Sequence, residues 1–358
     1  PIPGLHDLCV RDPQQHEAVA VGGNSQIMMN LKIVTAWQRF LCLLLLGMLA
    51  AILVVACNPA NDVDSPAPQT QDCRVVQHQM GESCIPRNPQ RVIAIKPNHF
   101  ANSLTLGIKP IASAFYDGFP MWDVLREEVG EIESLGDLNA PNIEKILRLE
   151  PDLILSNSHL DSIYPQLAQI APTVVLNADF PPPPYWREEF QELAQILNKE
   201  DTYQQLMADY WQQIEKLKQA LGDRYQNAEI SFGGTASSAG VWAYGAKHPV
   251  SEILHDLGLQ RPDSQKGDFY FLENITAEKL ADIDGDILFL TSWGRKEDLE
   301  EREKLIQSPL WQKLKAVRAG RVYFVDPDWV NPANFLSVKA ILDDLEDYLG
   351  LLTEAETK

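Results

Sequence analysis

Two histidines in the first half of the chain could bind a metal. His99 and His159 each come shortly after an apolar, strand-like run, and a neutral imidazole is a common ligand of a metal ion or a haem iron. A bare-metal site would need further ligands from the second half. The histidines there are poorly placed, because His248 precedes Pro249 and His255 falls within a predicted helix. We therefore expect no direct metal ligation, and a ligand that carries its own chelator.

A larger group of residues could bind a bulky, charged molecule. Its members end or follow predicted strands, and parallel sheets bind their ligands at that position. They are Lys96, His99, Tyr116, Asn157 and His159 in the first half, and Trp242, Tyr244, Trp293, Arg295 and Trp329 in the second. Aromatic rings would line an apolar ligand surface, and cations would meet its charge. The alternatives are that each tryptophan belongs to the core and that Arg295 begins a solvated helix.

The chain lacks common catalytic motifs. The patterns G-x-S-x-G, H-E-x-x-H and G-x-x-x-x-G-K-[ST] do not occur. The run Gly233-Gly234-Thr235 follows a predicted strand and could form an oxyanion-type turn, but no ordered set of Ser, His and Asp accompanies it. Glycines that permit tight turns, Gly240 among them, are the simpler interpretation. We therefore expect a binding protein and no enzyme.

The elements that must position these residues occur twice. Glu144 and Asp152 stand before an apolar, strand-like run, and Glu278 and Asp286 repeat this arrangement with the same spacing. The flanking helix ends and strands recur in the same order. The repeat predicts two α/β lobes that are built alike, with a ligand cleft between them.

Alternating strands and helices predict Rossmann-like lobes, each with a mostly parallel central sheet that is covered on both faces. We expect strands at 92–95, 111–115, 153–155, 173–176, 229–232, 287–290 and 322–325. The predicted domains are an N-terminal lobe at 73–185, a connecting helix at 186–222 and a C-terminal lobe at 223–352.

The connecting segment contains one long amphipathic helix. Asp201 can cap it, and apolar residues recur at steps of three and four from Tyr203 to Leu221. At ~1.5 Å per residue the helix would be about 30 Å long, enough to run along both lobes. If it is the only crossing, its stiffness predicts small closure motions.

The residues before the lobes predict export. Lys32 and Arg39 precede the apolar run 40–56, which ends at Cys57. This order predicts a signal peptide at 28–56. The cysteine at the cleavage point resembles a bacterial lipobox, in which the thiol receives a lipid. A membrane-spanning anchor is the alternative, although the run is slightly short for one.

Two further segments complete this region. Residues 1–27 are predicted to be an upstream extension, and 57–72 a flexible linker, because this segment is polar and rich in proline. Acyl chains on Cys57 would then hold the protein at a membrane surface.

Export also permits disulfides. Cys73 and Cys84 flank Gly81 in a predicted hairpin. Zinc is the alternative, but two thiols are too few for a structural zinc site. We expect a disulfide, with a stabilisation of roughly 2–3 kcal/mol.

Composition supports a soluble, globular body and excludes one class of partner. Hydrophobic residues make up 45% of the chain, enough for a substantial core. The net charge is −20, and lysines and arginines do not cluster. Such a field repels phosphate backbones, so nucleic acid is not expected to bind.

Several short motifs, taken in order, resemble one family. They are Pro89–Ala94, Pro141–Ile146, Glu150–Leu155, Ile170–Val175, Pro309–Trp311 and Gly320–Val322. The chain resembles, over about residues 73–352, the periplasmic binding proteins of ABC importers for ferric siderophores, ferric dicitrate and vitamin B12. The resemblance implies two lobes joined by one long helix. It also implies capture of a ferric siderophore or ferric dicitrate, with no resident cofactor. The alternative is a receptor for haem, cobalamin or a metal ion held by His99 and His159.

The resemblance also gives the repeated glutamates a role. In this family one glutamate per lobe docks onto arginines of the membrane permease, and the matching residues are Glu144 and Glu278. The alternative is that they are solvated acids favoured by a helix dipole. The protein is expected to be a monomer, anchored by lipid and located in the periplasm.

Overall fold

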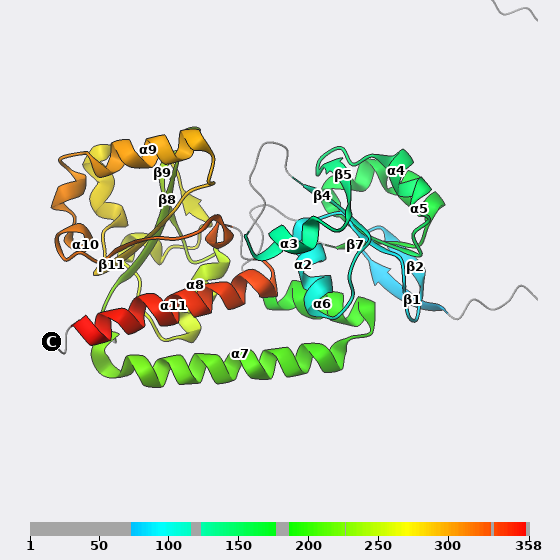
Figure 1. Ribbon diagram of the computed structural model, residues 1–358, viewed down its shortest axis with the longest axis horizontal. Helices are drawn as coiled ribbons and strands as arrows, with labels where there is room; N and C mark the ends of the chain where they lie inside the picture. Colours follow the sequence, from blue (N-terminus) through cyan, green and yellow to red (C-terminus); the bar gives the residue numbers. More distant parts are fainter. Residues whose placement is uncertain (1–72, 116–122, 177–185, 226, 331–332, 356–358) are drawn as a thin grey trace, which may run out of the picture. The chain divides into compact units, whose positions relative to one another are not determined.

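The computed structural model describes residues 73–115, 123–176, 186–225, 227–330 and 333–355. The predicted extension, signal peptide and linker, with Cys57, lie outside these residues, and so does Tyr116. The chain divides into two compact units, Pro1–Gln69 and Thr70–Lys358. All described elements belong to the second unit, which contains two separate five-stranded sheets (Figure 1).

The first sheet is entirely parallel and has the strand order β5-β4-β3-β6-β7. The strands are β3 (Val92–Ala94), β4 (Ala112–Phe115), β5 (Glu133–Asp137), β6 (Leu153–Asn157) and β7 (Thr173–Leu176). Sequence patterns did not predict β5, because this edge strand buries only Leu135 and is otherwise polar. The strands that were predicted are apolar runs buried between helices.

Helices cover both faces of this sheet. On one face lie α4 (Ile143–Arg148) and α5 (Tyr164–Ile170), and on the other lie α2 (Pro97–Thr105) and α6 (Trp186–Leu197) (Figure 1). The short α3 (Arg126–Val129) follows β4 in the chain. A proline sets the start of α2. The helix begins at Pro97, whose fixed φ suits the first helical position, and Lys96 is the N-cap residue.

A hairpin precedes the first sheet. Its strands are β1 (Cys73–His78) and β2 (Gly81–Pro86), and they pair in antiparallel fashion. A disulfide joins Cys73 to Cys84, with 5.5 Å between their Cα atoms. The Ser83 hydroxyl donates to the carbonyl of Thr173 at 2.8 Å, so the hairpin is also tied to β7.

The second sheet has the strand order β10-β9-β8-β11-β12, so its first strand along the chain, β8, is central, as β3 is in the first sheet. The strands are β8 (Ile230–Ala236), β9 (Gly240–Tyr244), β10 (Phe271–Leu272), β11 (Ile287–Thr291) and β12 (Val322–Phe324). β8 pairs in parallel with β11, and β11 with β12, whereas β9 runs antiparallel to both β8 and β10. The connection from β8 to β9 is too short for a helical crossover, and Gly240 turns the chain with a φ of 63°.

Two glycines predicted in a turn lie inside β8 instead. Gly233 pairs with Ala243, and Gly234 pairs with Trp242. A Cβ atom on Gly233 would lie 2.6 Å from the carbonyl oxygen of Trp242, and one on Gly234 would lie 2.2 Å from its indole ring. Gly233 and Gly234 therefore allow β8 to pack closely against the backbone and the indole ring of Trp242. The prediction that they form a turn was wrong.

The repeated aspartates join equivalent strands in both lobes. Asp152, before β6, accepts hydrogen bonds from the backbone N–H groups of Gln90 (2.7 Å) and Arg91 (2.9 Å), before β3. Asp286, before β11, accepts one from the N–H of Glu229 (2.9 Å), before β8. The repeated aspartate thus makes an equivalent contact in both lobes: it bonds the backbone just before the neighbouring central strand.

The predicted connecting segment, 186–222, contains two helices. After α6, Asn198 adopts a φ of 57°, and α7 (Glu200–Leu221) then extends over 22 residues. Its first residue is Glu200, so Asp201 lies in the first turn and is no cap. The buried face of α7 carries Tyr203, Met207, Tyr210, Ile214, Leu217 and Leu221.

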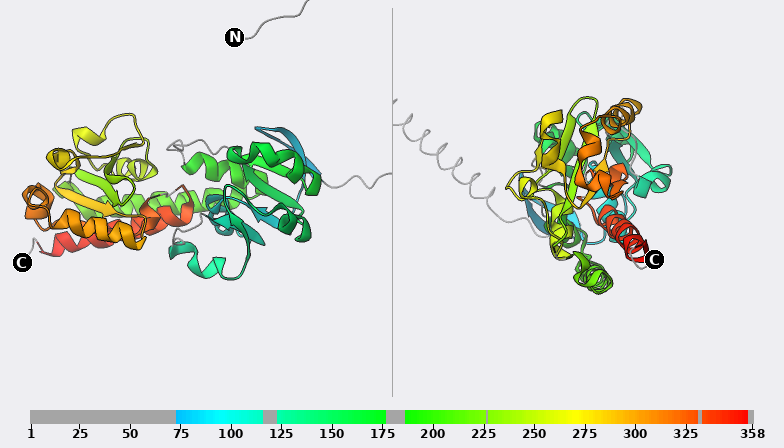
Figure 2. Two further views of the ribbon diagram at one scale, coloured as in Figure 1. Left: turned by 90° about the horizontal axis from the view of Figure 1, so that it is seen from above. Right: turned by 90° about the vertical axis from the view of Figure 1, so that its left-hand side faces the viewer.

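A second long helix also joins the lobes. α11 (Phe335–Ala355) runs beside α7 and contacts α2 and α6 of the first lobe (Figures 1 and 2). The backbone N–H of Phe335 donates to the Asn102 side chain on α2 at 2.9 Å. One hydrophobic core continues from the first sheet through α6, α7 and α11 to the second sheet. α7 is therefore not the only crossing.

The remaining helices cover the second sheet. α8 (Pro249–Asp256) packs on the same side as α11, while α9 (Lys296–Ile306) and α10 (Lys315–Arg318) belong to the other side (Figure 1). Within the part of the chain that the structure describes, no helix has both the length and the hydrophobicity to cross a bilayer.

Candidate functional site

Lys96 and His99 lie together just past the carboxyl end of β3. Lys96 Nζ is 3.7 Å, and His99 Nε2 is 3.3 Å, from the carboxylate of Glu189 on α6. Burial acts to raise the pKa of Glu189, but Lys96 and His99 outweigh it, so its pKa is lowered. Sequence reasoning missed Glu189, because nothing in its amphipathic helix indicates that it meets residues at the start of α2. These three residues form one mostly buried, charge-paired group.

The two candidate metal-binding histidines do not form a joint site. His99 is fully buried, whereas His159 is exposed. Burial lowers the pKa of His99, and Glu189 offsets this only in part, so the imidazole is neutral at neutral pH. Among the described residues, no group of three His, Cys, Asp or Glu side chains is arranged to hold a metal ion.

Asn157 has a structural task at the end of β6. Its side-chain oxygen accepts a hydrogen bond from the backbone N–H of His159 at 3.0 Å, which caps the 3-10 helix η2 (Ser158–Ile163). The neighbouring Ser156 hydroxyl and the Asn98 side-chain oxygen are buried, and neither has a hydrogen-bond partner within the described ranges. These two polar atoms were not predicted, and a ligand or water could satisfy them.

Three predicted residues of the second lobe come together. The Trp242 and Trp293 rings have centroids 5.6 Å apart, and the Arg295 guanidinium carbon lies 5.2 Å from the Trp293 ring centroid. Trp242 lies opposite Gly234 near the carboxyl end of β8, and Trp293 follows β11. Trp242 is 3% exposed, whereas Trp293 and Arg295 are both partly exposed. A ligand would therefore meet Trp293 and Arg295, with Trp242 supporting the Trp293 ring from behind.

A buried carboxylate fixes Arg295. Asp298 Oδ2 is 2.8 Å from Arg295 Nε, and its Oδ1 accepts hydrogen bonds from both the N–H and the hydroxyl of Ser237, each at 3.1 Å. Burial acts to raise the pKa of Asp298, but the bonds from Arg295 and Ser237 prevail and lower it. The start of α9 is thereby attached to the turn after β8. Arg295 is the N-cap residue of α9, close to the helix start that the alternative interpretation gave it, and its guanidinium also lies over the Trp293 ring.

Two predicted ligand residues lie in the core instead. Trp329 is fully buried, stacks on Phe289 with centroids 5.0 Å apart, and donates its indole N–H to Asp344 at 2.8 Å. Tyr244 is 2% exposed and stacks on Phe232 at 4.6 Å. Neither side chain has surface for a ligand here. Tyr244 was misplaced because β9 runs antiparallel, so its carboxyl end is at the other edge of the sheet.

The repeated glutamates are both exposed at helix starts. Glu144 lies in the first turn of α4, and Glu278 in the first turn of the 3-10 helix η5 (Ala277–Ile283). Hydrogen bonds from its own backbone N–H and from the Thr276 hydroxyl lower the pKa of Glu278. Each lobe thus presents one carboxylate at an equivalent position.

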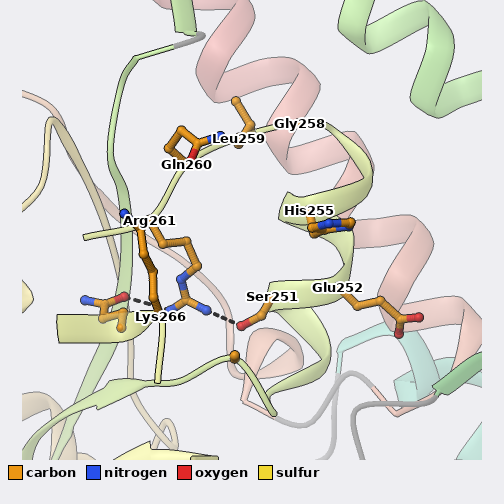
Figure 3. Close-up of a pocket in the computed structure, with 10 residues that line it drawn as sticks. Ser251, Glu252, His255, Gly258, Leu259, Gln260, Arg261 and Lys266 are labelled. Carbon is orange, nitrogen blue, oxygen red and sulfur yellow. Dashed lines mark hydrogen bonds between the residues drawn. The ribbon is translucent and has the colours of Figure 1, made fainter. Parts of the chain in front are cut away.

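A pocket of the second lobe is built from other residues (Figure 3). Arg261, Ser251 and His255 line it, and none of the predicted ligand residues does. The Arg261 guanidinium donates to the Gln265 side chain at 2.7 Å and to the carbonyl of Gly245 at 3.2 Å. Burial lowers its pKa to about 10. These bonds tie the end of β9 to the loop after α8, which is a structural role.

The chain resembles known proteins over most of its length. The family model for periplasmic binding proteins matches residues 116–329. A probable siderophore-binding lipoprotein of Bacillus subtilis, YfiY, is 30% identical over 87% of this chain and 98% of its own. The Fe(3+)-citrate-binding protein YfmC of the same organism is 29% identical over 87% of this chain and 96% of its own.

Solved structures agree with the fold. Staphylococcus aureus SirA, crystallised with staphyloferrin B, superposes with a TM-score of 0.66 at 22% identity, covering 77% of this chain and 98% of that one. With the match to the family model and to YfiY, the chain belongs to the periplasmic binding protein family.

Proposed function

We propose that this protein captures an iron(III) chelate, a ferric siderophore or ferric citrate, and delivers it to the permease of an ABC importer. The observation that carries the proposal is the stack of Trp242, Trp293 and Arg295 at the carboxyl end of the second sheet. Rigid rings and a guanidinium offer a bulky chelate both an apolar surface and hydrogen-bond donors. Lys96 supplies a cation past the carboxyl end of the first sheet.

The relatives support the same ligand class. Two of them are named for binding siderophores or iron(III) citrate, and they match almost their whole length. The alternative ligands, haem or a metal held by His99 and His159, have less support, because one histidine is buried beside Glu189 and the other is exposed. The cleft between the lobes remains a prediction, since residues 116–122 and 177–185, which follow β4 and β7, lie outside the described ranges.

Delivery and anchoring complete the proposal. Glu144 and Glu278 would dock onto permease arginines, and acylated Cys57 would anchor the protein, as a monomer, to a bacterial membrane in the periplasm. Exposed carboxylates at equivalent helix starts suit a partner with matching twofold symmetry. The name of YfiY, a lipoprotein, agrees with this location.

The proposal is tested by titrating the protein with ferric citrate, a ferric hydroxamate and a ferric catecholate while tryptophan fluorescence is recorded. We expect quenching by at least one chelate, and loss of most of this signal in Trp293→Ala. The control is Trp211→Ala, since Trp211 is 43% exposed on α7 and outside the stack. A flat response to all three chelates, with quenching by haem or cobalamin, would overturn the proposal. Mass spectrometry of copurifying ligand gives an independent answer.

A further inference from the structure

The cations of the candidate site are each matched by a carboxylate. Lys96 lies 3.7 Å from Glu189, and Arg295 lies 2.8 Å from Asp298. Both acids are largely or fully buried, at 16% and 0% side-chain exposure. The pKa values of Glu189 and Asp298 are lowered, so both are ionised at neutral pH, and burial keeps His99 neutral by lowering its pKa. The charges of these five residues therefore cancel.

The segments that directly follow β4 and β7, residues 116–122 and 177–185, contain no Lys or Arg in their sequences. They contain one acid each, Asp117 and Asp179. Arg126, at the start of α3 after β4, is exposed and has an interaction partner of its own. Beyond the site, Lys296 is exposed and lies 3.8 Å from Glu300 on the same helix. The chain as a whole carries a net charge of −20.

This charge balance discriminates between ferric chelates. A hydroxamate carries one negative charge, so an iron(III) trishydroxamate is neutral overall. A catecholate carries two, so an iron(III) triscatecholate is a trianion. A trianion that enters this site would lose its hydration, which costs free energy. The site has no surplus positive charge to offset this cost, and the protein as a whole is negatively charged. A neutral chelate avoids this cost and can still accept hydrogen bonds from Arg295 and stack on Trp293.

We infer that the site is selective for ferric chelates of low net charge, of the hydroxamate type, over triscatecholates, and that Glu189 and Asp298 set this selectivity. The inference rests on the proposed function and narrows its substrate class. Glu189 and Asp298 act as positioning residues, because they hold and neutralise the cations that would touch the ligand.

The experiment compares the dissociation constants of ferrichrome, a neutral trishydroxamate, and ferric enterobactin, a triscatecholate. We expect ferrichrome to bind the full chain at least about tenfold more tightly. Its affinity should change less than about twofold between low and high salt, since screening acts on charged ligands. Tighter binding of the triscatecholate would overturn the inference and leave the proposed function intact. Failure of every ferric chelate to bind would overturn both.

Variants test the two carboxylates separately. Asp298→Asn and Glu189→Gln each uncover one cation, so each should shift the ratio of the two dissociation constants toward the triscatecholate by about tenfold. Glu300→Gln is the matched control, because it removes one negative charge from the same helix as Asp298 without touching Arg295. If Asp298→Asn does not fold, the Glu189→Gln variant and the measurements at low and high salt still test the inference. If Glu300→Gln shifts the ratio of the dissociation constants as much as the test variants do, the selectivity does not depend on Glu189 and Asp298 in particular.

Discussion

The guanidinium of Arg187 pairs with the carboxylate of Asp256 and so joins α6, on the first lobe, to α8, on the second. Glu252, one turn earlier on α8, pairs with the same guanidinium. The Tyr210 hydroxyl on α7 donates to Asp256 at 2.6 Å. Three helices thus meet at one ion-pair network. The sequence predicted that a single helix joins the lobes. In the structure, this ion-pair network and α11 join them as well.

This network predicts a pH-dependent stability. Burial raises the pKa of Glu252 from 4.5 to about 7, although Arg187 acts to lower it. The folded state therefore binds this proton more tightly than the unfolded state. The stability that protonated Glu252 contributes is fully present below its pKa in the unfolded state. It is lost as the pH rises through its folded-state pKa of about 7. Glu252→Gln, which mimics the neutral form, should be more stable than the native chain by about 1–2 kcal/mol above pH 7, allowing for partial exposure.

Urea unfolding between pH 5 and pH 8 measures this difference. The gap between variant and native chain should shrink toward pH 5, where the native Glu252 is itself protonated. Glu346→Gln is the control, because Glu346 pairs with Lys216 at an exposed site and should show no such trend. A gap that stays constant with pH would contradict the raised pKa of Glu252.

Gly234 should be intolerant of a side chain. In Gly234→Ala the new Cβ would lie 2.2 Å from the Trp242 ring, so the ring must move. We expect a loss of about 1–3 kcal/mol of stability from overpacking. We also expect a changed aromatic circular dichroism signal and weaker ferric chelate binding. In the control, Gly320→Ala, the backbone is strained but nothing lies within 4 Å of the new Cβ. Its binding should not change, and a similar loss of binding there would contradict the packing argument.

The repeated glutamates should matter for uptake and not for capture. Replacing Glu144 and Glu278 together by Ala would remove the proposed charge-assisted hydrogen bonds to the permease, for which we expect roughly 1.5–3 kcal/mol each. We expect cellular iron uptake to be abolished while the dissociation constant for the chelate stays unchanged. Glu215 and Glu301, two other surface acids, provide the control pair. Lost chelate affinity in the test variant would place the glutamates in the ligand site.

The hairpin disulfide should stabilise the folded domain. Replacing Cys73 and Cys84 by Ser should lower the free energy of unfolding by about 2–3 kcal/mol, the chain-entropy value for a short closed loop. Chemical reduction of the native protein should cause a similar loss in urea unfolding. A loss well under about 1 kcal/mol in both cases would show that hydrogen bonds such as Ser83 to Thr173 already hold the hairpin.

The sequence by itself determined the two-lobed plan. The Glu and Asp repeat marked equivalent helix starts and strand joints, and the apolar runs marked the buried strands, because burial on both faces requires continuous hydrophobic residues. It also singled out Lys96, Trp293 and Arg295, since strand ends can be located from local patterns.

Only the tertiary structure decided which side chains meet. Glu189 and Asp298 neutralise the two cations, Tyr244 and Trp329 turn into the core, and Gly234 admits an indole ring. Each of these outcomes depends on contacts between residues far apart in the chain or on the direction of a strand. Local periodicity carries no information on either, because it reports which face is buried and not what that face packs against.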